Sequence, residues 1–383
     1  MAFPQARRKI KALIVVGARP NFMKAAPLIR AMKDSGVFLP ILVHTGQHYD
    51  YDMSKSFFEA LGLPKPHLYL GVGSGTHGEQ TAKVILAMEN HLLQKTTRPD
   101  LVVVVGDVNS TLAAALAARK LNIPVAHVEA GLRSFDESIP EEINRRLTDQ
   151  ISSFLFITEE SARKNLLREG IDAKKIHFVG NTMIDSLYKN MPQISASGIL
   201  GRLNLLQRSY AVLTLHRPSN VDSRENFKKM LNIIDYAQKK LPVVFPMHPR
   251  TLKQLDLLGL KRRLSKLKRV VVTDPLGYND FIKLVAGARF ILTDSGGIQE
   301  EATVLKVPCI TLRENTERPV TAEIGTNIIA GTNLENIKKS INNVLRGRVQ
   351  KGKIPKYWDG RAAERVVKIL RNHYETFGSN TYV

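Results

Sequence analysis

KALIVVGARPNFMKAAPLIRAM, residues 11–32, sets the pattern from which we predict the fold. A short run of β-branched apolar residues passes through a turn at Gly17 into a longer stretch with helical spacing. Further apolar runs follow at residues 38–46, 101–107, 124–130, 154–158 and 176–181. Helical stretches fit between them at residues 20–32, 79–93, 110–120, 141–151 and 159–168. Strands that alternate with helices are typical of a parallel sheet with helices on both faces.

The pattern weakens at residues 190–209, NMPQISASGILGRLNLLQRS, and then restarts. The second set of apolar runs lies at residues 210–216, 242–248, 269–275, 288–297, 307–313 and 326–331. We therefore expect an α/β protein with two Rossmann-like, doubly wound domains, residues 1–190 and 191–359, facing a cleft. The last helical stretch, within residues 360–383, is expected to pack back on the first domain.

The composition is that of a globular protein, with 383 residues of which 43% are hydrophobic and 24% charged. No apolar run reaches the roughly 20 residues of a membrane span, and the N-terminus lacks the apolar middle region of a signal peptide. We therefore expect a soluble, cytoplasmic protein. Because Cys309 is the only cysteine, internal disulfides and zinc sites built on paired thiolates are excluded.

The chain has a formal net charge of +21, from 56 Lys and Arg against 35 Asp and Glu. Such an excess fits a nucleic-acid binder, an anionic-lipid binder or an enzyme for phosphorylated substrates. The densest cluster, KRRLSKLKR at residues 261–269, spaces its leucines like the buried side of a short helix, which favours a solvated face. Aromatic residues are only 7% and no nucleic-acid-binding motif appears, so we expect neither nucleic acid nor a membrane as partner.

Acidic residues concentrate in HVEAGLRSFDESIPEEINRR, residues 127–146, although the chain as a whole is basic. Glu129 and Asp107 each stand at the end of a predicted strand. Because the carboxyl ends of neighbouring parallel strands share one edge, we expect the two carboxylates to face one another with coupled pKa values, one acting as acid and the other as base. The alternative for Asp107 is that it starts the helix that follows it.

Glu141 follows Pro140 in the first turn of a predicted helix, where the helix dipole favours a negative side chain even without a catalytic role. Arg145 lies one turn later, so it can pair with Glu141 on the same helix face. The other acids of this stretch are expected in a loop or on the surface: Asp136, Glu137 and Glu142.

Other predicted strand ends favour bound anions. Arg19 and Lys24 project near the start of the helix that follows the first strand, although the sequence there is not a Walker A loop. Ser295–Gly297 form a small-residue turn into a helix, which is a cradle of backbone N–H groups for an anion. Glu301, one turn later, can accept both hydroxyls of a ribose.

Two histidines follow strands of the second half. His216 stands with Arg217, and His248 stands with Arg250 two residues later. The histidines lack metal-ligand spacing, so we expect no metal. A histidine at this position contacts a phosphate or a leaving group about as often as it is structural.

A formal G-x-G-x-x-G pattern occurs at Gly73, Gly75 and Gly78. The dinucleotide-binding fingerprint follows the first buried strand of its domain, whereas this pattern lies well inside the first domain. We therefore expect a substrate-facing loop or a plain connection, and no nicotinamide cofactor.

The motifs in order resemble those of the non-hydrolysing UDP-N-acetylglucosamine 2-epimerases. The matching segments span nearly the whole chain: GARPNFMKAAPL, HTGQH, GDVNSTLAAALAA, HVEAGLRS, PEEINRRLTD, GNTMIDSL, LHR, HPRT, LTDSGGIQEEA and TERPVTAEIGTN. The resemblance implies a glycosyltransferase-B-like fold, in which the second domain holds UDP and the sugar faces the first.

The resemblance also implies the reaction. A proton leaves the sugar C2 while the bond from C1 to UDP breaks, and re-addition on the other face converts UDP-N-acetylglucosamine to UDP-N-acetylmannosamine. No cofactor is needed. A homodimer that supplies precursors of surface polysaccharides is implied as well.

Carried over by position, the resemblance implies acid/base or sugar-positioning roles for Asp107, Glu129 and Glu141, with His216 steadying the departing phosphate. It implies that Leu276 and Phe281 flank uracil. The residues expected to bind the substrate are Arg19, Lys24, Arg145, Arg217, His248, Leu276, Phe281, Ser295, Gly296, Gly297, Glu301 and Arg318.

The chain departs from the family pattern in two places. Pro218 and Ser219 stand where many bacterial members carry two further charged residues. Gln47 and His48 match a motif with which some members bind a second UDP-N-acetylglucosamine allosterically, but the region expected to hold the accompanying arginine reads GVGSGTHGEQT. Allosteric activation therefore stays open.

The substrate has alternatives within and beyond the family. HTGQHYDYDMS, LRSFDESIPEEINR and FPMHPRT are also similar to relatives that epimerise UDP-2,3-diacetamido-glucuronate, whereas TERPVTAEIGTN favours the N-acetylglucosamine branch. A UDP-sugar glycosyltransferase of similar fold is a more distant alternative.

Overall fold

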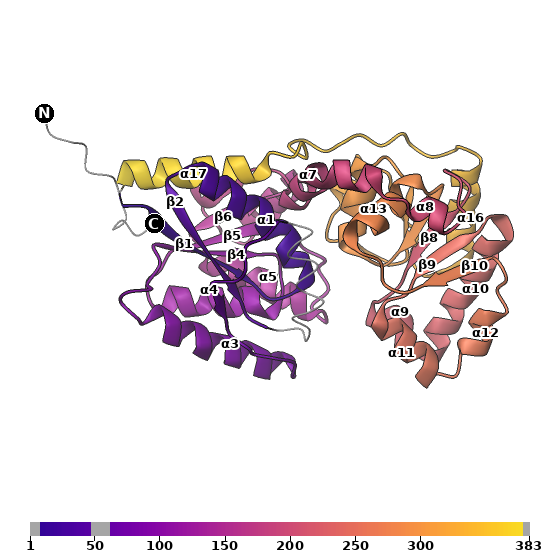
Figure 1. The fold of residues 1–383 in the computed structure, drawn as a ribbon, viewed down its shortest axis with the longest axis horizontal. Coiled ribbons are helices and arrows are strands. Elements are labelled where there is room, and N and C mark those ends of the chain that lie inside the picture. Colours follow the sequence, from indigo (N-terminus) through magenta and orange to yellow (C-terminus); the bar gives the residue numbers. More distant parts are fainter. Residues whose placement is uncertain (1–7, 47–61, 378–383) are drawn as a thin grey trace, which may run out of the picture. The chain divides into compact units, whose positions relative to one another are not determined.

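The computed structural model describes residues 8–46 and 62–377, without the side chains of Arg19 and Phe377. The chain forms two compact units, one of residues 1–189 with 356–383 and one of residues 190–355 (Figure 1). None of the helices in the described residues has the length and apolar character that crossing a membrane requires.

A seven-stranded parallel sheet with the strand order β3-β2-β1-β4-β5-β6-β7 forms the centre of the first unit. Its strands are β1 (Ile10–Val16), β2 (Phe38–His44), β3 (Leu68–Tyr69), β4 (Leu101–Val105), β5 (Val125–Ala130), β6 (Phe154–Ile157) and β7 (Ile176–Phe178). Its helices are α1 (Arg19–Asp34), α3 (His77–Leu92), α4 (Asn109–Lys120), α5 (Pro140–Ile151), α6 (Glu160–Arg168), a short 3₁₀ helix (Ala173–Lys175), α7 (Thr182–Ala196), which leads into the second unit, and α17 (Ala362–Phe377).

A six-stranded parallel sheet with the order β10-β9-β8-β11-β12-β13 forms the centre of the second unit. Its strands are β8 (Ala211–Thr214), β9 (Val243–Pro246), β10 (Val270–Thr273), β11 (Phe290–Thr293), β12 (Cys309–Thr311) and β13 (Asn327–Ile329). Its helices are α8 (Ile199–Arg202), α9 (Pro218–Val221), α10 (Arg224–Lys240), α11 (Pro249–Leu257), α12 (Lys261–Ser265), α13 (Tyr278–Gly287), α14 (Gly296–Val304), α15 (Val320–Glu323) and α16 (Leu334–Leu345).

Both sheets reverse their strand order once, between β1 and β4 and between β8 and β11. Doubly wound sheets bind ligands outside the carboxyl ends of the strands at such switch points. The predicted fold class, two Rossmann-like α/β domains, is confirmed. Several strands are shorter than the predicted runs because turns end them: β4 stops at Val105, and Gly106 then turns with a φ of 69°.

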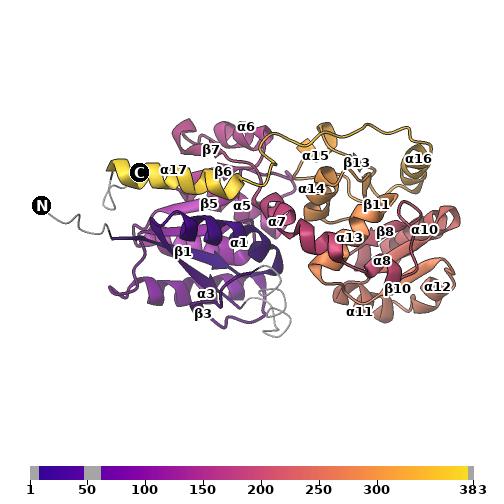
Figure 2. The same ribbon diagram turned by 45° about the horizontal axis from the view of Figure 1, so that its top comes forward.

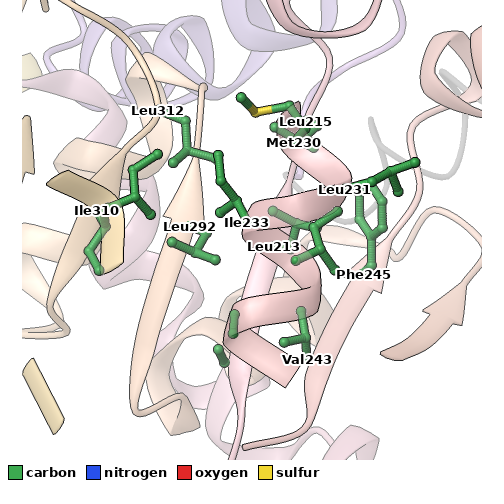
Figure 3. Packing of buried hydrophobic residues seen from close by; sticks show 14 of the residues in the cluster. Leu213, Leu215, Met230, Leu231, Ile233, Val243, Phe245, Leu292, Ile310 and Leu312 are labelled. Carbon is green, nitrogen blue, oxygen red and sulfur yellow. The ribbon is translucent and has the colours of Figure 1, made fainter. Parts of the chain in front are cut away.

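The core of the second unit lies between its sheet and α10. Phe227, Met230, Leu231 and Ile234 recur at helical spacing on the buried side of α10. Figure 3 shows Met230 and Leu231 among side chains from β8, β9, β11 and β12. Burying a large apolar side chain contributes about 1.5–3 kcal/mol, so this packing fixes the strand ends that carry the polar residues described below.

The C-terminal helix α17 belongs to the first unit and runs beside α1 (Figure 2). Tyr374 meets the ring of Phe38 edge-on, with ring centroids 6.4 Å apart, and its hydroxyl donates to the carbonyl oxygen of Asp100 at 2.9 Å. Before the helix, buried Trp358 donates its indole N–H to the Thr158 carbonyl oxygen at 3.0 Å. Residues 358–374 are therefore held by contacts with the first unit at both their ends.

Candidate active site

A buried ion pair lies at the carboxyl ends of the central strands of the first unit. Lys24, from α1, pairs with Glu129 near the end of β5, and both side chains are more than nine-tenths buried. An isolated buried charge is costly, so each member requires the other. Gly106 makes room for the pair, because a Cβ there would lie 3.1 Å from Lys24 Nζ.

The backbone at Glu129 is bent. Its φ of 74° lies in the left-handed region, and the pairing of β5 with β6 shifts register between Val128 and Ala130. A non-glycine residue there costs of order 1–3 kcal/mol, and such strain gathers at functional sites where the surroundings enforce it. No sequence pattern signalled this bend.

Asp107 lies beyond β4 and pairs with Arg145 of α5. Arg145 Nε and Nη2 donate to Asp107 Oδ2 at 2.9 and 2.7 Å, and the Asp107 side chain keeps 27% of its surface exposed. The structure places Val108, and not Asp107, at the N-cap position of α4. Asp107 and Glu129 each have a cationic partner of their own.

Glu142 corrects two predictions. It is 2% exposed rather than on the surface, and it accepts hydrogen bonds from the backbone N–H groups of Ser134 and Phe135. Arg145 Nη1 also donates to it, at 2.6 Å. Arg145 therefore bonds Asp107 and Glu142 instead of the predicted Glu141, which is half-buried and makes no hydrogen bond or ion pair with any described residue.

Three amide side chains that were not predicted support Asp107. Asn144 donates to the Asp107 carbonyl oxygen at 2.9 Å and to Asn109 Oδ1 at 3.2 Å. Asn109 in turn donates to Gln80 Oε1 at 3.0 Å. Amides carry no distinctive sequence signal, and these come from three different helices.

Some predicted positions cannot be placed here. The side chain of Arg19 and the residues Gln47 and His48 lie outside the described part of the chain. The glycine pattern spans the connection from β3 to α3, where Thr76 caps α3 by accepting from the Glu79 N–H.

In the second unit, His216 follows β8 and is held by Asp294, which follows β11. His216 Nδ1 lies 2.9 Å from Asp294 Oδ1, and the same carboxylate accepts the backbone N–H groups of His216 and Arg217. Burial raises the pKa of Asp294, but His216 and these hydrogen bonds hold the pKa below its usual value. The exposed edge of the His216 ring is thereby oriented by a buried charge.

Asp294 was missed, although its position after a buried strand is the signal that pointed to Asp107. His248 lies near His216, with ring centroids 5.7 Å apart, and its Nδ1 caps α11 by accepting from the Arg250 N–H. Arg217 Nη2 lies 3.9 Å from Glu317 Oε1. The two histidine motifs of the sequence therefore meet at one sheet edge.

The predicted anion cradle begins α14, with Ser295 as its N-cap. Arg318 reaches this turn, because a Cβ on Gly296 would lie 2.6 Å from its Nη1. Arg318 also pairs with Glu300 at 2.8 Å and Glu317 at 3.0 Å, and all three side chains are buried. A guanidinium and the positive end of a nine-residue helix thus converge, an arrangement that suits a phosphate.

Glu301 of α14 accepts a hydrogen bond from the Tyr278 hydroxyl at 3.0 Å. Burial and, to a smaller extent, the adjacent Glu300 raise the pKa of Glu301 to about 8, although the hydrogen bond from Tyr278 acts to lower it. Leu276 and Phe281 pack on the apolar cluster that α14 shares. The residues predicted to contact ribose and uracil therefore lie near one another in the second unit.

We expect Glu301→Gln to flatten the pH dependence of stability. Between about pH 4.5 and 8 the folded protein keeps a proton on Glu301 that the unfolded chain releases, so the free energy of unfolding falls as the pH rises through this window. The neutral glutamine removes that fall, and urea unfolding at pH 5 and pH 8 measures it. Glu335→Gln, at an exposed carboxylate of α16, is the control with the wild-type slope. An unchanged slope in Glu301→Gln would contradict the prediction.

Comparison with known proteins decides the family. The sequence profile of the UDP-N-acetylglucosamine 2-epimerase family matches residues 30–371. The chain belongs to this family. A UDP-N-acetylglucosamine 2-epimerase of Methanocaldococcus jannaschii is 46% identical over 94% of this chain and 99% of its own. A UDP-2,3-diacetamido-2,3-dideoxy-D-glucuronate 2-epimerase of Pseudomonas aeruginosa is 40% identical over 94% of this chain and 99% of its own.

Solved structures agree with the family assignment. The crystal structure of the M. jannaschii epimerase in complex with UDP-N-acetylglucosamine and UDP has a TM-score of 0.87 and covers 95% of this chain and 100% of that chain. The epimerase of Neisseria meningitidis bound to UDP-N-acetylglucosamine, 29% identical, has a TM-score of 0.85 with the same coverage. The predicted epimerase family and its enzyme class, isomerase, are confirmed.

Proposed function

We propose that this protein interconverts UDP-N-acetylglucosamine and UDP-N-acetylmannosamine. The observation that carries the proposal is the pairing of two strand-end carboxylates with buried cations, Glu129 with Lys24 and Asp107 with Arg145. A weakly acidic C2 proton is removed only by a well-placed base, and its return on the other face requires a placed acid. The 46% identity to the M. jannaschii epimerase supports the same substrate.

We propose elimination and re-addition as the mechanism. A carboxylate takes the C2 proton, the C–H electrons form a C1=C2 double bond, and the C1–O bond breaks so that UDP leaves with its electron pair. A proton then returns to C2 on the opposite face while the β-phosphate oxygen attacks C1. The charge on the departing diphosphate is stabilised by the anion cradle (Ser295–Gly297), together with Arg318 and His216.

The test is incubation with UDP-N-acetylglucosamine in heavy water. We expect solvent deuterium at C2 of both epimers and formation of UDP-N-acetylmannosamine. Free N-acetylmannosamine as the main product would indicate a hydrolysing enzyme instead, and product that requires an acceptor and carries no C2 label would indicate a glycosyltransferase.

The second candidate substrate is UDP-2,3-diacetamido-2,3-dideoxy-D-glucuronate, which the 40% identical P. aeruginosa relative supports. The same assay with this sugar distinguishes the two, since the better substrate has the higher kcat/KM. The homodimer and the cytoplasmic location stay predictions, which light scattering and cell fractionation test.

We expect Arg318→Ala to raise the Kd for UDP at least about tenfold, because it removes a charge-assisted contact to the diphosphate. The substitution also leaves the buried carboxylates of Glu300 and Glu317 without this cation. Breaking a buried ion pair in this way lowers the free energy of unfolding by about 3–5 kcal/mol. Calorimetric titration with UDP at a temperature where the variant is folded measures the first effect. Arg263→Ala, on the exposed face of α12, controls for the lost charge. Wild-type affinity in Arg318→Ala would remove Arg318 from the nucleotide site.

A further inference from the structure

His127 lies on β5, two residues before Glu129, and its ring is fully buried. Its Nδ1 lies 2.7 Å from Asp149 Oδ1, and its Nε2 lies 2.8 Å from the carbonyl oxygen of Gly106. Both partners are hydrogen-bond acceptors. An imidazole ring donates to two acceptors only when both nitrogens carry protons, so the geometry indicates a buried imidazolium.

Asp149, on α5, is the counter-charge. Its buried carboxylate also accepts the Gly131 N–H at 3.1 Å and pairs with Arg133 at 2.8 Å. Burial raises the pKa of Asp149, but His127 and Arg133 together hold it below its usual value. The carboxylate therefore stays charged and lies against the ring of His127.

These contacts surround both candidate catalytic carboxylates. Gly106, held by His127, directly precedes Asp107, and Gly131, held by Asp149, lies two residues after Glu129. Glu129 itself sits in the strained bend, which persists only if the flanking backbone is fixed. Asp149 also lies one turn after Arg145 on α5, so the same contacts set the position of the Asp107 partner.

We propose that His127 and Asp149 are positioning residues, a buried imidazolium–carboxylate pair that holds Asp107 and Glu129 at the separation the C2 proton transfers require. The inference rests on the proposed function. Neither side chain is exposed, so both act through the backbone that they hold.

The first test is Asp149→Asn, which preserves size and removes the charge. We expect kcat to fall at least about tenfold with KM within about twofold of wild type, because small displacements of catalytic groups lower turnover by up to about a hundredfold. A kcat within twofold of wild type would overturn the proposal.

Asp100→Asn is the matched control. Asp100 also accepts a backbone N–H, from Lys11 at 2.8 Å, and pairs with Arg8, but it lies at the amino end of β4, away from the carboxyl ends. We expect this variant to lose stability without losing kcat. The proposal would be overturned if Asp100→Asn and Asp149→Asn lost the same stability and also the same kcat. Asp149 would then have only a general structural role.

The second test does not depend on activity. In ¹⁵N-histidine spectra of the wild-type protein, assigned by comparison with His127→Gln, we expect protons on both ring nitrogens of His127 at neutral pH. A neutral ring would overturn the proposal. If the wild type fails to epimerise either UDP-sugar, the proposed function fails, while these spectra still decide whether the buried ion pair exists.

The double variant His127→Gln with Asp149→Asn completes the set. Because the two residues act as one unit, its kcat should lie close to that of the slower single variant. If the fold-loss of kcat in the double variant equalled the product of the two single losses, the proposal would be overturned.

Discussion

Glu129→Gln is expected to lower kcat at least about a hundredfold, which is the scale of a lost general acid or base. Glutamine keeps the size of the side chain but cannot take the C2 proton. The Kd for UDP should stay within about twofold, because the anion cradle is built by the second unit. Steady-state epimerisation and calorimetric titration with UDP measure the two quantities.

The substitution also leaves the ammonium of Lys24 buried without its partner, so unfolding must be measured beside turnover. Glu137→Gln is the matched control. Glu137 belongs to the same segment, but its side chain is 79% exposed and pairs with Arg146 on the surface. Near-normal turnover in folded Glu129→Gln would remove Glu129 from the chemistry.

Asp107→Asn is expected to lower kcat by a similar factor with a smaller loss of stability. Asp107 is partly exposed, and its partner Arg145 keeps the ion pair with Glu142. If the two carboxylates serve opposite faces of C2, each variant blocks exchange from one epimer only. Solvent-deuterium exchange measured separately from UDP-N-acetylglucosamine and UDP-N-acetylmannosamine therefore assigns the faces.

Asp100→Asn, at the other end of β4, controls for the loss of a carboxylate beside that strand. It should keep wild-type exchange from both epimers. Wild-type turnover in Asp107→Asn would contradict the prediction, and loss of exchange from both epimers would show that one carboxylate is required for both transfers.

The strand-end positions of Asp107, Glu129, His216 and Ser295 were predictable because apolar runs in parallel sheets are buried and end at polar turns. Their partners were not. Helical spacing suggested that Arg145 pairs with Glu141, but spacing along one helix says nothing about a carboxylate on a neighbouring strand. Arg145 reaches Asp107 instead, 38 residues away in sequence.

The burial of Glu142 was also not predictable from local sequence. Glu142 appeared as one surface acid among several, because a charged residue in a loop-to-helix segment is usually solvated. In the structure its carboxylate accepts two backbone N–H groups and the Arg145 guanidinium, which compensates the cost of burying it. Only the path of residues 134–135 places those donors there.

The sequence by itself determined the alternation of strands and helices, the family, and the residue types at the strand ends, because these depend on local periodicity and composition. The tertiary structure decided which cation meets which carboxylate, the bend at Glu129, and the buried contacts of His127. These depend on strand order and on the packing of helices against the sheets, which bring residues 22 and 78 positions apart within hydrogen-bonding distance. His127 of β5 meets Asp149 of α5, and His216 after β8 meets Asp294 after β11. Hydrogen bonds act over a few ångströms in space, whatever the separation along the chain.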